Sequence, residues 1–182
     1  IDALGGVMGL LADQTTLQHK VLNKSKGRAV WSPRSQVDKI EYTKKIQKIV
    51  LNAKKIQIVE DEVVNFNVQH KTVVSVLLKS GTELACSALV VTCGTFMSGL
   101  IHIGNKQFKG GRMGEKGSFG LTKNLIDYGF VINRLKTGTP PRAYKNSINW
   151  EGLEVASGDS APQPFSMFTP KPFQPKNIPC YL

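Results

Sequence analysis

Apolar residues near the start of the chain recur at intervals of three and four and predict an amphipathic helix. They are Leu4, Val7, Met8 and Leu11. Residues 16–22 form a short mixed segment that predicts a strand. The sequence Asn23-Lys-Ser-Lys-Gly27 that follows is typical of a basic turn.

A second amphipathic helix is predicted after Ser32, which suits a helix N-cap, and Pro33, which suits a first turn. Its apolar stripe consists of Tyr42, Ile46, Ile49, Val50 and Ala53. Its opposite face carries Lys39, Lys44, Lys45, Lys48 and Lys54. We interpret that face as solvated first and as RNA-facing second.

The hydrophobic period changes to two between residues 56 and 93, which predicts a series of strands. A short strand is expected at 56–60, followed by an antiparallel meander of strands at 63–68, 72–78 and 83–86. The apolar run 88–93 is typical of a strand covered on both faces, and it ends at Gly94 and Thr95. The fold class is therefore α/β. A meander in place of a helical crossover resembles the later part of an FAD-binding dinucleotide fold of the glutathione-reductase type.

Glycine becomes frequent after Gly94, and a helix is predicted at 119–128, where Gly129 ends it. Proline dominates the region beyond Lys136. That region is interpreted either as a linker or as the start of a second domain. We expect residues 1–135 to form part of one domain and residues 136–182 to begin a second.

The chain of 182 residues begins at Ile1 rather than Met, and we expect it to be an internal piece of a longer polypeptide. It has 24 Lys and Arg against 13 Asp and Glu, giving a formal charge of +11. Such an excess favours a polyanionic partner, nucleic acid above all. The alternative is a lysine-rich solvated surface. No apolar run approaches the roughly 18 residues of a membrane helix, so no membrane span is expected.

Familiar catalytic and metal sites are not visible in the sequence. The isolated cysteines Cys86, Cys93 and Cys180 suit a reducing compartment, and no metal site is expected. Neither a nucleotide-triphosphate P-loop nor a G-x-G-x-x-G fingerprint is present. Residues alone therefore indicate an α/β protein that binds a nucleotide, with RNA as a candidate partner.

Four regions offer candidate binding chemistry, and each has a plainer alternative. The glycine-rich loop that enters a helix near Ser118 suits a cofactor phosphate or ribose, or is a surface loop capped by that serine. Gly94 lets a ring system approach the end of a strand, or serves a tight turn. The stretch 134–142 and the cations around Trp31 suit RNA binding. The alternative for both is a solvated surface, and the alternative for Trp31 itself is packing in the core.

Six ordered motifs take the interpretation further. They are Ile1-Asp-Ala-Leu-Gly-Gly6, Leu22-Asn-Lys-Ser-Lys-Gly27, Gly94-Thr-Phe96, Ile101-His-Ile-Gly104, Gly110-Gly-Arg112 and the stretch 134–142. This combination closely resembles the glucose-inhibited division protein A (GidA, or MnmG) family of tRNA uridine 5-carboxymethylaminomethyl modification enzymes.

The resemblance implies an FAD-dependent enzyme that acts on the wobble uridine of tRNA. Residues 1–135 would then belong to its FAD-binding domain, without the N-terminal G-x-G-x-x-G segment, and residues 136–182 would begin an inserted NADH-linked or substrate domain. The resemblance implies NADH and methylene-tetrahydrofolate as co-substrates, a GTPase partner of the MnmE type, and a homodimer in the bacterial cytoplasm; an organellar copy remains open. A folate- and FAD-dependent tRNA uracil methyltransferase relative and a cofactor-free basic RNA-binding module are the alternatives.

The resemblance also implies roles for individual residues. Val63 and Ser118 match FAD contacts, and Gly94, Thr95, Asn23, Lys26 and Gly27 would approach the flavin. Arg112, Lys136 and Arg142 would contact tRNA or NADH. Arg28 departs from the family, which usually has Pro there. The redox cysteines of the family fall outside residues 1–182, so no catalytic residue is assigned and the piece alone is expected to be inactive.

Overall fold

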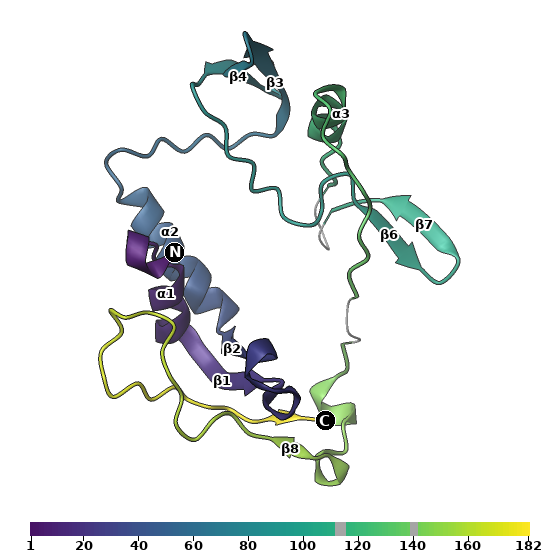
Figure 1. Cartoon of the computed structure of the whole chain (residues 1–182). Coiled ribbons are helices and arrows are strands. Elements are labelled where there is room, and N and C mark those ends of the chain that lie inside the picture. Colours follow the sequence, from purple (N-terminus) through teal and green to yellow (C-terminus); the bar gives the residue numbers. More distant parts are fainter. Residues whose placement is uncertain (112–115, 139–141) are drawn as a thin grey trace. The chain divides into compact units, whose positions relative to one another are not determined.

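The computed structural model describes residues 1–111, 116–138 and 142–182 (Figure 1). The chain forms two compact units. The first combines Ile1–Ile58 with Pro140–Leu182, and the second is Val59–Thr139. Both helices and strands are present, so the predicted mixed α/β class is confirmed. The predicted domain boundary between residues 135 and 136 stays a prediction.

The first unit opens with a short 3-10 helix, Asp2–Leu4, and the α-helix α1, Met8–Thr15. The helix starts later than the apolar spacing predicts, because Gly5 interrupts the chain with a φ of 81° and Leu4 is exposed. Strand β1, Thr16–Leu22, follows directly, as predicted. It pairs antiparallel with β2, Ser32–Val37.

The second helix, α2, spans Lys39–Leu51, and its predicted start is wrong. Ser32 and Pro33 lie in β2, where proline is tolerated because the strand is at a sheet edge. The true N-cap is Asp38, whose carboxylate accepts hydrogen bonds from the N–H groups of Ile40 and Glu41 at 3.0 and 3.1 Å. An ionised carboxylate also suits the positive end of the helix dipole.

The C-terminal part of the first unit has little regular structure. It contains the 3-10 helices Lys145–Ser147 and Trp150–Gly152, and a two-residue strand pair, β8 (Val155–Ala156) with β9 (Cys180–Tyr181). Gln18, only 1% exposed, ties β1 to this pair. Its amide nitrogen donates to the carbonyls of Ala156 and Ile178, both at 3.0 Å.

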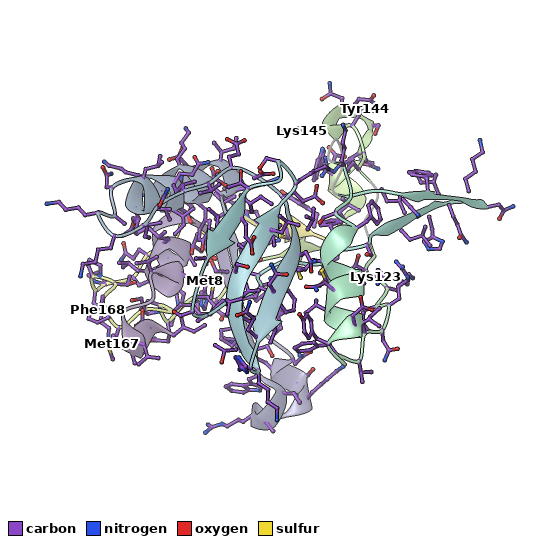
Figure 2. The ribbon with its side chains drawn as sticks, turned by 90° about the horizontal axis from the view of Figure 1, so that it is seen from above. Met8, Lys123, Tyr144, Lys145, Met167 and Phe168 are labelled. Atoms are coloured by element: carbon purple, nitrogen blue, oxygen red, sulfur yellow. The ribbon has the colours of Figure 1, made fainter. Side chains whose placement is uncertain are left out.

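A second buried polar residue anchors the proline-rich segment of the first unit. The Asp13 carboxylate accepts from the N–H groups of Phe165 and Ser166, both at 2.9 Å, and from the Thr169 hydroxyl at 2.6 Å. Three satisfied hydrogen bonds offset the cost of burying this charge. Met167 and Phe168 remain exposed at the surface (Figure 2).

The second unit contains the predicted antiparallel meander. It consists of β3 (Val63–Gln69), β4 (Thr72–Leu78) and β5 (Glu83–Ala85) in that order. Helix α3, Gly120–Asp127, lies along the meander (Figure 2). Phe66, Val76, Leu78 and Leu121 form the buried core between them. The prediction of this helix, ended by Gly129 at a φ of 85°, is confirmed.

Two predicted strands do not form. Residues 56–60 and 88–93 are extended, and no described residue pairs with either segment. An apolar run becomes a buried strand only when neighbouring strands and covering layers satisfy its backbone, and Val90 is instead 83% exposed. A hairpin that was not predicted joins β6 (Leu100–Ile103) to β7 (Lys106–Lys109).

Candidate functional site

The second unit contains a cavity of about 470 Å³ at the beginning of β3. Its walls come from Glu62 and Val63, the extended segment 89–93, Phe96 and Met97, and the loop and helix start at Lys116, Ser118 and Leu121. This volume falls within the range of sites for small molecules and cofactors. The two residues to which the family resemblance assigns FAD contacts, Val63 and Ser118, thus lie on the wall of one cavity.

The backbone of Val63 is oriented toward the open edge of the sheet. The N–H of Lys79 on the β4 side donates to the carbonyl of Glu62 at 2.8 Å. Backbone groups of successive strand residues point to opposite sides, so the N–H and C=O of Val63 point away from β4. Because β3 is the edge strand of its sheet, these groups are positioned to receive a ligand.

Ser118 is held by main-chain contacts just before α3. It forms a parallel bridge with Met97, and its carbonyl accepts from the N–H of Ser98 at 2.7 Å. The helix begins at Gly120 with Phe119 at the cap position and no side-chain cap. Ser118 is therefore not the helix cap that the plainer interpretation expected, and its hydroxyl lies beside the Glu62 carboxylate.

An ion pair that the sequence did not reveal borders the cavity. The ammonium of Lys79 lies 2.7 Å from Oε2 of Glu62. Lys79 and the Ser118 hydroxyl hold the pKa of Glu62 below its usual value, against smaller opposing effects of desolvation and Asp61. Glu62 precedes Val63 directly, but its partner lies across a hairpin, so no local signal pointed to the pair.

The remaining walls of the cavity are mainly apolar. Leu89, Val91, Phe96 and Met97 supply side chains, and Phe96 is 43% exposed. A half-exposed aromatic ring with aliphatic neighbours suits the face of a planar ligand. These apolar side chains, together with the polar groups of Glu62 and Ser118, fit the adenosine part of a dinucleotide.

Gly94 and Thr95 form a turn directly after the cavity segment. Gly94 has a φ of 62°, a conformation that side chains rarely adopt, so the tight-turn interpretation is supported. Neither residue lines the cavity, although their neighbour Cys93 does. An approach of either residue to a flavin stays a prediction.

Asn23, Lys26 and Gly27 belong to the first unit. Asn23 and Gly27 adopt positive φ values of 60° and 90° on either side of a 3-10 turn. The expectation that the nearby Trp31 packs in the core is wrong, since Trp31 is 42% exposed with the Arg28 guanidinium 5.7 Å from its ring. The indole N–H donates to the Lys24 carbonyl at 3.2 Å, which fixes the ring on the turn.

The predicted tRNA or NADH contacts are less defined. Lys136 and Arg142 are exposed, and Arg112 lies outside the described residues. Arg134 has a structural role, because its guanidinium donates to the carbonyl of Ser98 at 2.9 Å.

Two further features of the described residues bear on function. A second cavity, of about 440 Å³, lies within the proline-rich segment 159–177, but it brings together none of the predicted site residues. Among the helices described, none has the length and apolar character needed to cross a membrane.

Comparisons with known proteins agree with the resemblance found in the sequence. The family profile described as "Glucose inhibited division protein A" matches residues 1–182. A relative from Aquifex aeolicus, named tRNA uridine 5-carboxymethylaminomethyl modification enzyme MnmG, is 46% identical over 93% of this chain. A relative of the same name from Sulfurihydrogenibium is 46% identical over the whole chain.

The fold agrees as well. A crystal structure of Aquifex aeolicus GidA superposes with a TM-score of 0.87 and 42% identity over 99% of this chain. The chain spans 27% and 30% of the two relatives and 31% of that structure, so it corresponds to less than a third of their length. With the whole chain matched in sequence and in fold, it belongs to the glucose-inhibited division protein A family.

Proposed function

We propose that this chain is part of an FAD-dependent enzyme that modifies carbon 5 of the wobble uridine in tRNA. The observation that carries the proposal is the 46% identity over essentially the whole chain to relatives named for that modification. The full-length protein would add a carboxymethylaminomethyl or aminomethyl group with methylene-tetrahydrofolate and NADH. Its GTPase partner would be of the MnmE type, and it would act as a homodimer in the cytoplasm.

The cavity at the start of β3 is the proposed adenosine end of the FAD site. The backbone of Val63 would pair with the adenine edge, and the Ser118 hydroxyl would contact the ribose. When bound, FAD supplies the redox step of the reaction. Residues Gly94, Thr95, Asn23, Lys26 and Gly27 are proposed to approach the flavin.

Positively charged residues provide the proposed contacts with tRNA. Lys136 and Arg142 are exposed and stand in a stretch rich in cations, to which Arg112 is added from the sequence. Lys and Arg side chains there would neutralise phosphates and position the RNA without reading its sequence. NADH is the other anion proposed for these residues.

Neither alternative function is favoured. The relatives that match essentially the whole chain are named for the carboxymethylaminomethyl modification, which argues against the related uracil methyltransferase. A cavity that joins backbone, carboxylate and aromatic groups argues against a module that binds RNA without any cofactor.

Deletion of the full-length gene tests the proposal. Mass spectrometry of tRNA hydrolysates should show loss of the carboxymethylaminomethyl-type side chain from wobble uridines, with recovery when the intact gene is restored. Unchanged wobble uridines in a strain with no second copy of the gene would reject the proposed function.

A further inference from the structure

We propose that Glu62 determines the specificity of the cavity at the start of β3, where its carboxylate accepts hydrogen bonds from the adenosine end of FAD. Lys79 is the positioning residue for this carboxylate. The inference rests on the proposed function, because it takes FAD as the ligand of this cavity. It concerns a residue to which the family resemblance gave no role.

Glu62 is fixed to Lys79 at two points. Its backbone carbonyl accepts the N–H of Lys79 at 2.8 Å, and its Oε2 atom lies 2.7 Å from the Lys79 ammonium. The Glu62 side chain is 28% exposed, whereas that of Lys79 is 63% exposed and does not line the cavity. The ion pair engages Oε2 from outside the cavity, and the Ser118 hydroxyl lies beside the same carboxylate. Each carboxylate oxygen has two lone pairs, so the group can still accept hydrogen bonds from a ligand.

The chemistry of the cavity suits a nucleoside. An ionised carboxylate only accepts hydrogen bonds, and the ribose hydroxyls and the adenine amino group are donors. The neighbouring N–H and C=O of Val63 add one donor and one acceptor for the edge of a base. A carboxylate repels phosphate, so Glu62 favours the nucleoside over the pyrophosphate. Lys116, on the same wall, is a cation that suits the pyrophosphate.

The protonation state supports this role. Lys79 and Ser118 keep the pKa of Glu62 below its usual value of 4.5, so the group is ionised at neutral pH. Both neighbours thus preserve the state that accepts hydrogen bonds.

Flavin binding by the full-length apoprotein tests the proposal. FAD and FMN share the isoalloxazine ring, but FMN lacks the adenosine, and both can be titrated by quenching of flavin fluorescence. Glu62→Gln should weaken FAD binding about tenfold, as expected for a hydrogen bond to a charged group, and leave FMN binding unchanged. Glu60→Gln removes the same charge from an exposed residue two positions earlier and should change neither.

Variants of Lys79 separate positioning from direct contact. Lys79→Met should weaken FAD binding less than Glu62→Gln does, and Lys79→Arg should restore it. The double variant should bind FAD no worse than Glu62→Gln alone, because Lys79 acts through the carboxylate. Thermal unfolding of each apoprotein shows whether the fold is retained, and Glu62→Asp, which keeps the charge, should lie between wild type and Glu62→Gln.

Three results would overturn the inference: wild-type FAD affinity in a folded Glu62→Gln variant, equal weakening of FAD and FMN, or weakening of NADH alone. Failure of the proposed function gives a different result. In that case the wild-type full-length protein binds neither flavin.

Discussion

The side-chain amide of Asn124 in α3 is hydrogen bonded to both backbone groups of Phe66 in β3. Its Oδ1 accepts the Phe66 N–H at 3.1 Å, and its Nδ2 donates to the Phe66 carbonyl at 3.4 Å. β3 is the edge strand of its sheet, so these backbone groups have no strand partner on that side. One amide thus replaces a neighbouring strand at this point and fixes α3 against the meander.

Asn124→Ala should destabilise the full-length protein by about 1–3 kcal/mol, because it leaves partly buried backbone groups unpaired. Urea unfolding, monitored by far-UV circular dichroism, measures the change in unfolding free energy. Lys123→Ala on the exposed face of α3 is the matched control (Figure 2). Equal stability of the two variants would show that the Asn124 contact contributes nothing.

Gly120→Ala should also destabilise the protein, although alanine usually favours helices over glycine by about 1 kcal/mol. A Cβ atom at Gly120 would lie 2.7 Å from the carbonyl oxygen of Val64 and would push α3 away from β3. A Cβ at Gly138 meets nothing within 4 Å, so Gly138→Ala is the control. The melting temperature should fall only for the first variant; an unchanged or raised value would contradict this packing.

Replacement of Gln18 should be among the most damaging changes in the first unit. Its Nε2 donates to two carbonyls, and its Oε1 accepts the Arg34 guanidinium at 3.2 Å. Gln18→Leu leaves these groups without partners and should cost about 2–4 kcal/mol of unfolding free energy. Gln47→Leu on the exposed face of α2 should cost little, and a similar loss in both would refute the explanation.

The contribution of Glu83 to the stability of the protein should depend on pH. Hydrogen bonds from the Ser75 hydroxyl and the Asn67 amide hold its pKa below the usual 4.5. A folded pKa below the unfolded one stabilises the protein above pH about 4.5, and the stabilisation is lost as the pH falls through the folded pKa. The difference in unfolding free energy between wild type and Glu83→Gln should therefore shrink on acidification; a constant difference would contradict it.

Lys136 and Arg142 should affect tRNA binding through charge alone, if the proposed function holds. Replacing either by Ala in the full-length protein should make the negative slope of log affinity against log salt concentration shallower by about one. Lys123→Ala is the control, since Asp127 already neutralises that lysine at 2.6 Å. Filter binding at several salt concentrations measures the slopes, and identical slopes would remove these residues from the interface.

The elements with a clear local sequence pattern were predicted. Strand β3 alternates apolar and polar residues, turn residues separate the meander strands, and Gly129 marks the end of α3, so the meander and the helix were both predicted. The start of α2 was predicted wrongly because Ser32-Pro33 has the chemistry of a cap, whereas the hairpin pairing of β1 with β2 takes those residues. The strand at 88–93 failed because apolarity alone does not supply neighbouring strands.

Contacts across long sequence distances were not predictable in the same way. Strands β8 and β9 have two residues each, too few for a periodic pattern, and the Gln18 side chain that holds them lies more than 130 positions away. Within the candidate site, Val63 and Ser118 came from the family resemblance, and they line one cavity. The Glu62–Lys79 pair depends on the register of β3 against β4, which the sequence does not specify.

The interrupted first unit has a consequence for the order of folding during synthesis. The second unit, Val59–Thr139, is built from one continuous stretch, so its internal contacts can form once that stretch leaves the ribosome. Gln18 cannot complete its hydrogen bonds until Ile178 has been translated. The first unit therefore has the higher contact order, and its N-terminal half stays incompletely packed, and open to chaperones and proteases, until the later stretch is translated.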